Sequence, residues 1–265
     1  MRYLFAHWRN FEQAIAEKCV LLFLDYDGTL TAIAESPNKA LLPKQTRTLL
    51  RRLSASSRCK LVIMSGRALR DIKERVGLTN IIYSGNHGLQ MWGPGVQPHP
   101  PVSPAYKAVL KQIRTRLRKR LSLLKGVLIE DKELSIGLHY RQVNNAQISF
   151  VKTAFHQIAG PFLTSNRIKV TAGKKVLEIM PSGQWNKGKG VLWLLRTCRA
   201  ARHFQSIVPV YVGDDITDED AFKALKDTGP TVFVGPVKKS YADYYSKSTA
   251  EVFQFLERLI SLLTS

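Results

Sequence analysis

Long apolar runs and cysteines are both scarce in this sequence. No apolar run approaches the roughly 20 residues that a membrane-spanning helix needs, so we expect no membrane association. The three cysteines, Cys19, Cys59 and Cys198, lie in or beside apolar segments without metal-ligand spacing. We interpret them as buried thiols in a reducing compartment. Residues 1–18 mix charged with apolar residues, unlike a signal peptide, so the sequence predicts a cytoplasmic location.

Acidic residues are also scarce. Twenty Asp and Glu stand against 40 Lys and Arg, a formal net charge of +20 in 265 residues. Such a charge suits a nucleic-acid binder, and it also suits attraction of a dianionic phosphate ester. The densest basic segment, 111–121, places Ile113, Leu117 and Leu121 on one stripe, which is typical of an amphipathic helix with a solvated basic face. Because aromatic residues and recognised nucleic-acid motifs are missing there, we expect no dedicated nucleic-acid partner.

Four apolar runs are predicted to be buried strands of an α/β protein. With 45% hydrophobic residues, the chain can bury a sizeable core, as one domain or as a core with a smaller inserted domain. The segments 43–53 and 68–76 read as crossover helices, so the sheet is expected to be parallel. The predicted strands are 20–24, 61–64, 81–84 and 208–212.

Each predicted strand ends in small and polar residues. Asp25 and Asp27 follow the first strand, with Gly28 allowing a sharp turn. In open α/β sheets, ligand sites lie outside the carboxyl ends of strands, so these ends are expected to converge on one crevice. Crowded carboxylates repel each other unless a cation or a shared proton compensates, and Mg2+ accepts such oxygens. The other three ends carry Ser65-Gly66-Arg67, Gly85-Asn86-His87-Gly88 and Gly213-Asp214-Asp215.

The pattern changes after a Pro- and Gly-rich stretch at 93–104, which we interpret as a linker. A helix at 106–121, a hairpin from 126–130 and 134–141, a helix at 147–159 and a hairpin from 167–171 and 175–180 give an α-β-β-α-β-β module. Such a sheet suits one helical face and one exposed face. The core then resumes with a helix at 191–198, a strand at 231–234 and a final helix at 251–263. The predicted division is 1–102 (core), 103–181 (inserted domain) and 182–265 (core).

Six motifs and one lysine occur in order along nearly the whole chain. They are Asp25-Tyr-Asp-Gly-Thr-Leu, Ser65-Gly-Arg, Gly85-Asn-His-Gly, Glu130-Asp-Lys-Glu-Leu-Ser, His139-Tyr-Arg, Lys187 at the start of a helix, and Gly213-Asp-Asp-x-Thr-Asp-Glu-Asp-Ala-Phe. This set resembles the haloacid dehalogenase superfamily of phosphotransferases. Within it, the chain is similar to the trehalose-6-phosphate phosphatase family, most specifically in the last motif and in the segment 130–141. The resemblance implies a Rossmannoid parallel-sheet core with an inserted α+β cap that closes over the active site.

The resemblance implies a role for each core motif. Asp25 would be the nucleophile and form an aspartyl-phosphate, which a carboxylate can do. Asp27 would protonate the leaving oxygen and then activate water; taken alone, it could be a turn residue. Ser65, Gly66 and Lys187 would hold the phosphoryl oxygens. The Mg2+ ligands would be Asp25, Asp27 through its backbone carbonyl, Asp214 and Asp215.

Some assignments stay open at the level of the sequence. Lys189 competes with Lys187, although Asn-Lys-Gly matches the family's Asp-Lys-Gly with Asn186 as the departure. Asp214 is the first choice as a direct metal ligand, and Asp215 and Asp218 could instead act through water or orient Lys187. Glu219 and Asp220 are interpreted as the acidic first turn of a helix.

The substrate contacts implied by the resemblance lie in two places. Arg67, Asn86 and His87 belong to core loops, and the loop of His87 would face the sugar. The alternative for the cap contacts is a solvated charged sheet edge. They are Glu130, Lys132, Arg141, Lys174 and Glu178.

The implied activity is Mg2+-dependent hydrolysis of trehalose 6-phosphate by a monomeric enzyme with a small sugar phosphate as its partner. The nearest alternative is a sugar phosphatase for sucrose phosphate, glucosylglycerol phosphate or mannosylglycerate phosphate. A non-catalytic basic binding module is a third, disfavoured by the intact set of motif residues.

Overall fold

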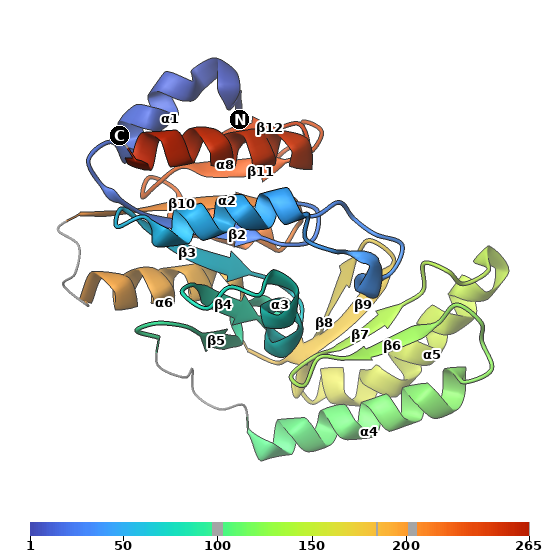
Figure 1. The fold of residues 1–265 in the computed structure, drawn as a ribbon. Coiled ribbons are helices and arrows are strands. Elements are labelled where there is room, and N and C mark those ends of the chain that lie inside the picture. The colour runs from blue at the N-terminus through green and yellow to red at the C-terminus, as the bar shows by residue number, and fades with distance from the viewer. Residues whose placement is uncertain (97–102, 184, 201–205, 265) are drawn as a thin grey trace. The chain divides into compact units, whose positions relative to one another are not determined.

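The computed structural model describes residues 1–96, 103–183, 185–200 and 206–264. The chain divides into two compact units (Figure 1). Unit 1 comprises Met1–His99 and Trp185–Ser265, and unit 2 comprises Pro100–Gln184. Among the described residues, no helix is both long and apolar enough to cross a membrane.

Unit 1 is built on one large sheet. Within the described segments it has eight strands in the order β1-β12-β11-β10-β2-β3-β4-β5, parallel except for the β4–β5 pair. The predicted parallel α/β architecture is therefore confirmed. The strands are β1 (Arg2–Tyr3), β2 (Cys19–Asp25), β3 (Cys59–Met64), β4 (Ile82–Gly85), β5 (Gln90–Trp92), β10 (Ile207–Gly213), β11 (Thr231–Val234) and β12 (Tyr244–Ser246).

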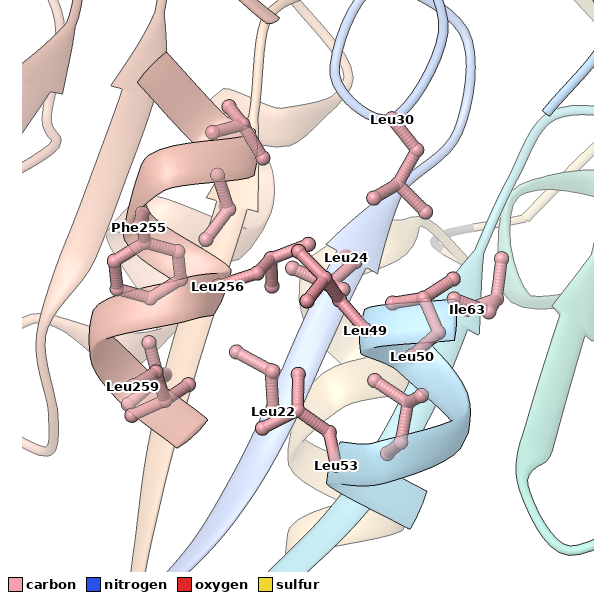
Figure 2. Packing of buried hydrophobic residues seen from close by; sticks show 14 of the residues in the cluster. Leu22, Leu24, Leu30, Leu49, Leu50, Leu53, Ile63, Phe255, Leu256 and Leu259 are labelled. Atoms are coloured by element: carbon pink, nitrogen blue, oxygen red, sulfur yellow. The ribbon is translucent and has the colours of Figure 1, made fainter. Parts of the chain in front are cut away.

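Helices cover both faces of this sheet, which is why β2 reads as an uninterrupted apolar run. Leu22 and Leu24 point to one face, where they join a cluster with leucines of α2 (Lys44–Ala55) and with Phe255 and Leu256 of α8 (Thr249–Thr264), as Figure 2 shows. That cluster also takes in buried residues of α1 (Trp8–Ile15) and α3 (Leu69–Val76). Leu21 and Phe23 point the other way, into a cluster with α6 (Lys187–Ala200) and α7 (Asp218–Leu225).

The register of the parallel strands places their carboxyl ends side by side. Asp25, the last residue of β2, pairs with Met64 of β3, which in turn pairs with Ser84 of β4. On the other side of β2, Leu24 pairs with Val212 of β10. The residues that follow β2, β3, β4 and β10 therefore emerge at one edge of the sheet, where α/β proteins bind ligands.

Unit 2 has the predicted α-β-β-α-β-β order. Its helices are α4 (Pro104–Leu121) and α5 (Asn145–Thr164), and its strands are β6 (Leu128–Asp131), β7 (Ile136–His139), β8 (Ile168–Gly173) and β9 (Val176–Pro181). The described strands form an antiparallel sheet in the order β6-β7-β9-β8. Ile136, Leu138, Leu177 and Ile179 share a buried core with the two helices, so one face of the sheet is covered.

Some local predictions were wrong. α5 was expected to end at residue 159, but it continues through Pro161, because its apolar stripe extends to the buried Phe162. The predicted linker 93–104 is too long at its end, since Ser103 caps α4 and Pro104 occupies its first turn; residues 97–102 lie outside the described ones. The sequence reading missed α1, β1, β5 and β12, of which the three strands are only two or three residues long.

Candidate active site

Lys187 and Asp25 form the centre of the polar strand edge. Asp25 ends β2 and is 5% exposed, and Lys187 is the first residue of α6 and is 2% exposed. Lys187 Nζ donates hydrogen bonds to Asp25 Oδ1 at 2.6 Å and to Asp218 Oδ1 at 2.8 Å. The lysine ammonium thus bridges two buried carboxylates that belong to different elements.

Asp218 holds Lys187 in this position. Its Oδ1 also accepts a hydrogen bond from Tyr211 Oη at 2.7 Å, and its Oδ2 accepts the backbone amides of Asp214 and Asp215 at 3.0 and 2.9 Å. A carboxylate offers about four lone-pair positions, so these four donors use its accepting capacity. Asp218 therefore acts as an anchor for the lysine and for the turn before α7, which is the orienting role considered from the sequence.

One carboxylate oxygen from each of Asp25, Asp214 and Asp218 lies within 4.8 Å of the other two. All three are buried, and one buried lysine opposes them, so a divalent cation would offset the excess negative charge. A Cβ on Gly28 would lie 2.2 Å from Asp214 Oδ2, and Gly28 has φ +94°, so only glycine lets this loop approach the carboxylate. Because Asp218 is saturated by donors, Asp25 and Asp214 are the carboxylates that fit a metal.

The pKa values in this cluster reflect burial and charge together. Burial raises the pKa of Asp25 well above its usual range; Lys187 opposes this rise, and the neighbouring aspartates add to it. Burial also disfavours the charge of Lys187, but Asp218 and Asp25 outweigh this, so its pKa stays above the ordinary value. Because two carboxylates contact the Lys187 ammonium directly, the lysine keeps its charge.

Asp215 differs from its neighbour Asp214. Its Oδ1 accepts hydrogen bonds from the amide and the hydroxyl of Thr217, both at 2.7 Å, which closes the turn before α7. Burial opposes its ionisation, yet Lys187 and the bonds from Thr217 lower its pKa to about 2. Asp215 therefore stays charged at neutral pH, with one oxygen engaged in the turn.

Asp27 meets Arg67 rather than a second acid. Arg67 Nε and Nη2 donate to the two carboxylate oxygens of Asp27, each at 2.7 Å. The side chain of Arg67 is 6% exposed and that of Asp27 is 41% exposed. Burial works against the charge of Arg67, but its hydrogen bonds to Asp27 raise its pKa above the ordinary value. The sequence predicted a substrate contact for Arg67; the structure gives it an internal partner.

The Ser65 and His87 loops lock into each other. The His87 amide donates to the Ser65 carbonyl at 3.0 Å, and the Ser65 hydroxyl accepts the Arg67 amide at 3.1 Å. A Cβ on Gly66 would lie 2.5 Å from the His87 ring, so glycine is required there. Asn86 and His87 both have positive φ, 49° and 54°, which is unusual for residues other than glycine. Such backbone conformations persist where the surrounding structure holds them, and they are common at functional sites.

The choice between Lys187 and Lys189 as the phosphate-binding lysine is decided by their burial. Lys187 lies inside the cluster, whereas Lys189 is exposed one position beyond Gly188. The Asn186 side chain accepts the Lys189 backbone amide at 2.9 Å and so caps α6. Asn and Asp cap helices about equally well, so an asparagine in place of the family's Asp leaves this cap in place.

Unit 2 carries its own polar cluster on one face of its sheet. Glu130, Gly137 and Glu178 are direct cross-strand neighbours on β6, β7 and β9. Lys132 Nζ donates to Glu178 Oε1 at 3.0 Å. The Ser135 hydroxyl donates to the same oxygen at 2.8 Å. Lys132 and Glu178 are both 7% exposed, so these two residues of the predicted cap set form a buried ion pair rather than part of a solvated edge.

Two other members of the predicted cap set lie at a hairpin edge. Arg141 Nη2 donates to the Lys174 carbonyl at 3.0 Å, and both residues are exposed. The sequence reading assigned no role to Ser135 or to His139, whose Nε2 lies 2.7 Å from Glu130 Oε2. His139 stands in a quoted motif, and two-residue alternation along β7 puts it on the face of Gly137, so the strand pattern could have identified it.

Comparisons with solved structures define the class of fold. The C-terminal domain of Candida albicans trehalose-6-phosphate phosphatase superposes with a TM-score of 0.78 over 96% of both chains at 24% identity, which shows the fold alone. A trehalose-6-phosphate phosphatase related protein gives 0.77 at 26% identity, covering 91% of this chain and 97% of that one. A haloacid dehalogenase-like hydrolase from Bacteroides thetaiotaomicron gives 0.64 at 17% identity, covering 91% and 100%. The protein has the haloacid dehalogenase-like fold with an α+β insertion.

The trehalose-phosphatase family matches residues 23–254, and the chain belongs to this family. A trehalose-phosphate phosphatase of Mycobacterium bovis is 35% identical over 243 residues, which are 90% of this chain and 60% of that protein. That of Mycobacterium marinum is 35% identical over 252 residues, 92% and 62% respectively. The chain therefore spans about 60% of the length of the curated relatives it matches.

Proposed function

We propose that this protein is a Mg2+-dependent phosphatase that hydrolyses trehalose 6-phosphate through an aspartyl-phosphate intermediate. The observation that carries the proposal is the contact of Lys187 with Asp25, at the carboxyl end of β2, and with Asp218, the first residue of α7. A strand-end aspartate beside a buried, fixed cation suits attack on a phosphoryl group, because the cation stabilises the charge that develops on its oxygens. Membership of the trehalose-phosphatase family supports the choice of substrate.

The reaction divides into two steps that use the same carboxyls. Lys187 occupies Oδ1 of Asp25, so we assign the attack on phosphorus to Oδ2. As the new O–P bond forms, the bond from phosphorus to the sugar oxygen breaks, and Asp27 gives that oxygen its proton. In the second step Asp27 takes a proton from water, the water oxygen bonds to phosphorus, and Asp25 is released with inorganic phosphate.

Asp25 and Asp214 would hold the metal, with the backbone carbonyl of Asp27 as a further ligand. Their carboxylate oxygens are the hard donors that Mg2+ prefers. When bound, the cation supplies electrostatic stabilisation of the phosphoryl oxygens. Ser65, Gly66 and Lys187 are the proposed phosphate contacts, and Asp215 adds negative charge near the metal ligands.

We further propose that unit 2 acts as the cap and reads the sugar. Glu130, Lys132 and Glu178 form a charged cluster in which hydroxyl groups would find both donors and acceptors. Arg141 and Lys174 at the hairpin edge of unit 2 are further proposed sugar contacts, and so are Asn86 and His87 in the loops of unit 1. The monomeric state and the cytoplasmic location stay predictions from the sequence.

The test is phosphate release from a panel of sugar phosphates, with and without Mg2+. The panel contains trehalose 6-phosphate, sucrose phosphate, glucosylglycerol phosphate, mannosylglycerate phosphate and an aryl phosphate. We expect trehalose 6-phosphate to have the highest kcat/KM and Asp25→Asn to abolish turnover, since an amide is a poor nucleophile. Equal activity on every sugar would contradict the substrate assignment, and an Asp25→Asn variant within tenfold of wild type would contradict the nucleophile.

A further inference from the structure

Arg67 makes its main contact with the proposed acid and base of the reaction. The Nε and Nη2 atoms of its guanidinium approach the two oxygens of Asp27 in a fork, with both distances 2.7 Å. A fork of two parallel hydrogen bonds fixes the plane of a carboxyl group as well as its position. Because the Asp27 side chain is 41% exposed, without this fork its terminal torsion would be broadly variable.

The guanidinium that holds Asp27 is itself held on several sides. Nη1 of Arg67 donates to Asp71 Oδ2 at 2.9 Å, and Nη2 also donates to the Pro37 carbonyl at 2.9 Å. The Cζ atom of Arg67 lies over the ring of Tyr26, 5.4 Å from its centroid. Asp71 is held in turn by Arg75, whose Nε lies 2.8 Å from its Oδ1. These contacts leave the fork little freedom to swing toward a ligand.

The backbone of Arg67 is fixed as firmly as its side chain. Its amide donates to the Ser65 hydroxyl at 3.1 Å, and its carbonyl accepts the Asn86 amide at 2.7 Å. The backbone of Arg67 is therefore hydrogen-bonded to both the Ser65 loop and the Asn86 loop of the candidate site. The backbone of Arg67 is held in place, and all three of its guanidinium nitrogens already donate hydrogen bonds within the protein. Such a side chain is suited to orient another group rather than to capture a mobile substrate.

We propose that Arg67 is a positioning residue for proton transfer by Asp27. This inference rests on the proposed function, since Asp27 transfers protons only if the chain is a phosphatase. Both steps need an Asp27 oxygen aimed at one point, first at the leaving sugar oxygen and then at water. Arg67 sets that aim through its fork, and Asp71 and Arg75 keep the fork in place.

The experiment compares two substrates that need the proton to different degrees. The sugar oxygen of trehalose 6-phosphate is a poor leaving group, whereas the oxygen of p-nitrophenyl phosphate leaves without protonation. General acid and base catalysis contributes roughly 100- to 10,000-fold, and Arg67 should carry part of it. We expect Arg67→Ala to lower kcat for trehalose 6-phosphate roughly 10- to 100-fold and to change kcat for p-nitrophenyl phosphate less than about threefold.

Two additions separate positioning from folding. Arg67→Lys keeps the charge and the aliphatic stem but loses the fork, so we expect the same selective loss in a fully folded protein. Guanidinium ion at millimolar concentration should restore part of the activity of Arg67→Ala on the sugar phosphate alone. Arg58→Ala is the control, because Arg58 is a half-buried arginine of the same unit whose side chain donates to the Leu262 carbonyl instead of to Asp27; it should leave the ratio of the two kcat values unchanged.

Each outcome decides one question. Wild type inactive on both substrates would refute the proposed function. If wild type is active and Asp27→Asn loses the sugar phosphate selectively, but both Arg67 variants lose the two substrates in parallel, the positioning role is wrong. The inference is also overturned if Arg67→Lys raises KM for trehalose 6-phosphate with kcat unchanged, since that result identifies a substrate contact.

Discussion

Replacing Lys187 by methionine should destabilise unit 1 severely. Lys187 is 2% exposed and lies 2.6 and 2.8 Å from Asp25 and Asp218, which are 5% and 0% exposed. At an effective dielectric constant of about 20, each pair attracts by about 6 kcal/mol before the cost of desolvation. Removing one partner from a buried ion pair costs about 3–5 kcal/mol, because the remaining charge is left uncompensated. Methionine fills similar space, so we expect that loss without a large cavity contribution.

A second substitution checks that charge, and not shape, causes the loss. Asp25→Asn removes one of the two carboxylates that Lys187→Met leaves behind, while Asp218 keeps its bonds from Tyr211 and two backbone amides. We therefore expect the double variant Lys187→Met/Asp25→Asn to recover at least half of the lost free energy of unfolding. Excess EDTA in all samples keeps a cation from replacing the lysine.

The assay is urea unfolding followed by tryptophan fluorescence. The four tryptophans of the chain, Trp8, Trp92, Trp185 and Trp193, all belong to unit 1, so their emission reports on that unit alone. A Lys187→Met variant within about 1 kcal/mol of wild type would contradict the buried pair. A double variant no more stable than the single one would show that the loss is not electrostatic.

Three further expectations follow from the same structure. EDTA should stop the reaction and Mg2+ restore it, whereas Ca2+ should bind and support little turnover, because its looser coordination misplaces the attacking oxygen; full activity in chelator excludes the metal site. Glu130→Ala and Arg141→Ala should each lower kcat/KM for trehalose 6-phosphate roughly ten- to a hundredfold, because each loses a charged hydrogen bond to a sugar hydroxyl. The kcat/KM for an aryl phosphate should stay unchanged. A parallel fall of kcat/KM for both substrates indicates a role in folding. Burial raises the pKa of Asp71, but bonds from Arg75 and Arg67 outweigh it and lower that pKa, so its charge stabilises the fold above about pH 4 and this contribution is lost as the pH falls through the lowered pKa. At pH 7 the free energy of unfolding of Asp71→Asn should therefore be about 1 kcal/mol below that of wild type, whereas in strong acid the two proteins should be equally stable. A difference in the free energy of unfolding that stays constant across this pH range refutes the assignment.

The strands and their polar ends were predictable because their signal is local. A run such as 20–24 must be buried on both faces to be stable, and only a parallel sheet covered by helices provides that. Pairs of extended runs joined by a short connection likewise predicted both hairpins of unit 2. Short edge strands such as β1 and β12 carry no such signal, since two or three residues cannot display a period.

The partners of the charged side chains were not predictable, because they come from residues far apart in the sequence. Arg67 and Asp27 are 40 positions apart, and Lys187 and Asp25 are 162 apart. Nothing in the local sequence distinguishes an arginine that binds a substrate from one that orients an acid. The same limit applied to Asp218, whose four donors come from three different elements or loops.

The sequence by itself determined the α/β architecture, the order of its main buried strands and the family, because burial patterns and motifs are properties of contiguous residues. The tertiary structure alone decided which charges are buried and what each one contacts. Lys187 and Lys189 are two positions apart on one helix, yet only Lys187 faces the sheet edge where Asp25 and Asp218 meet. The energy of a charge depends on its distance to other charges and to water, and the folded chain fixes both.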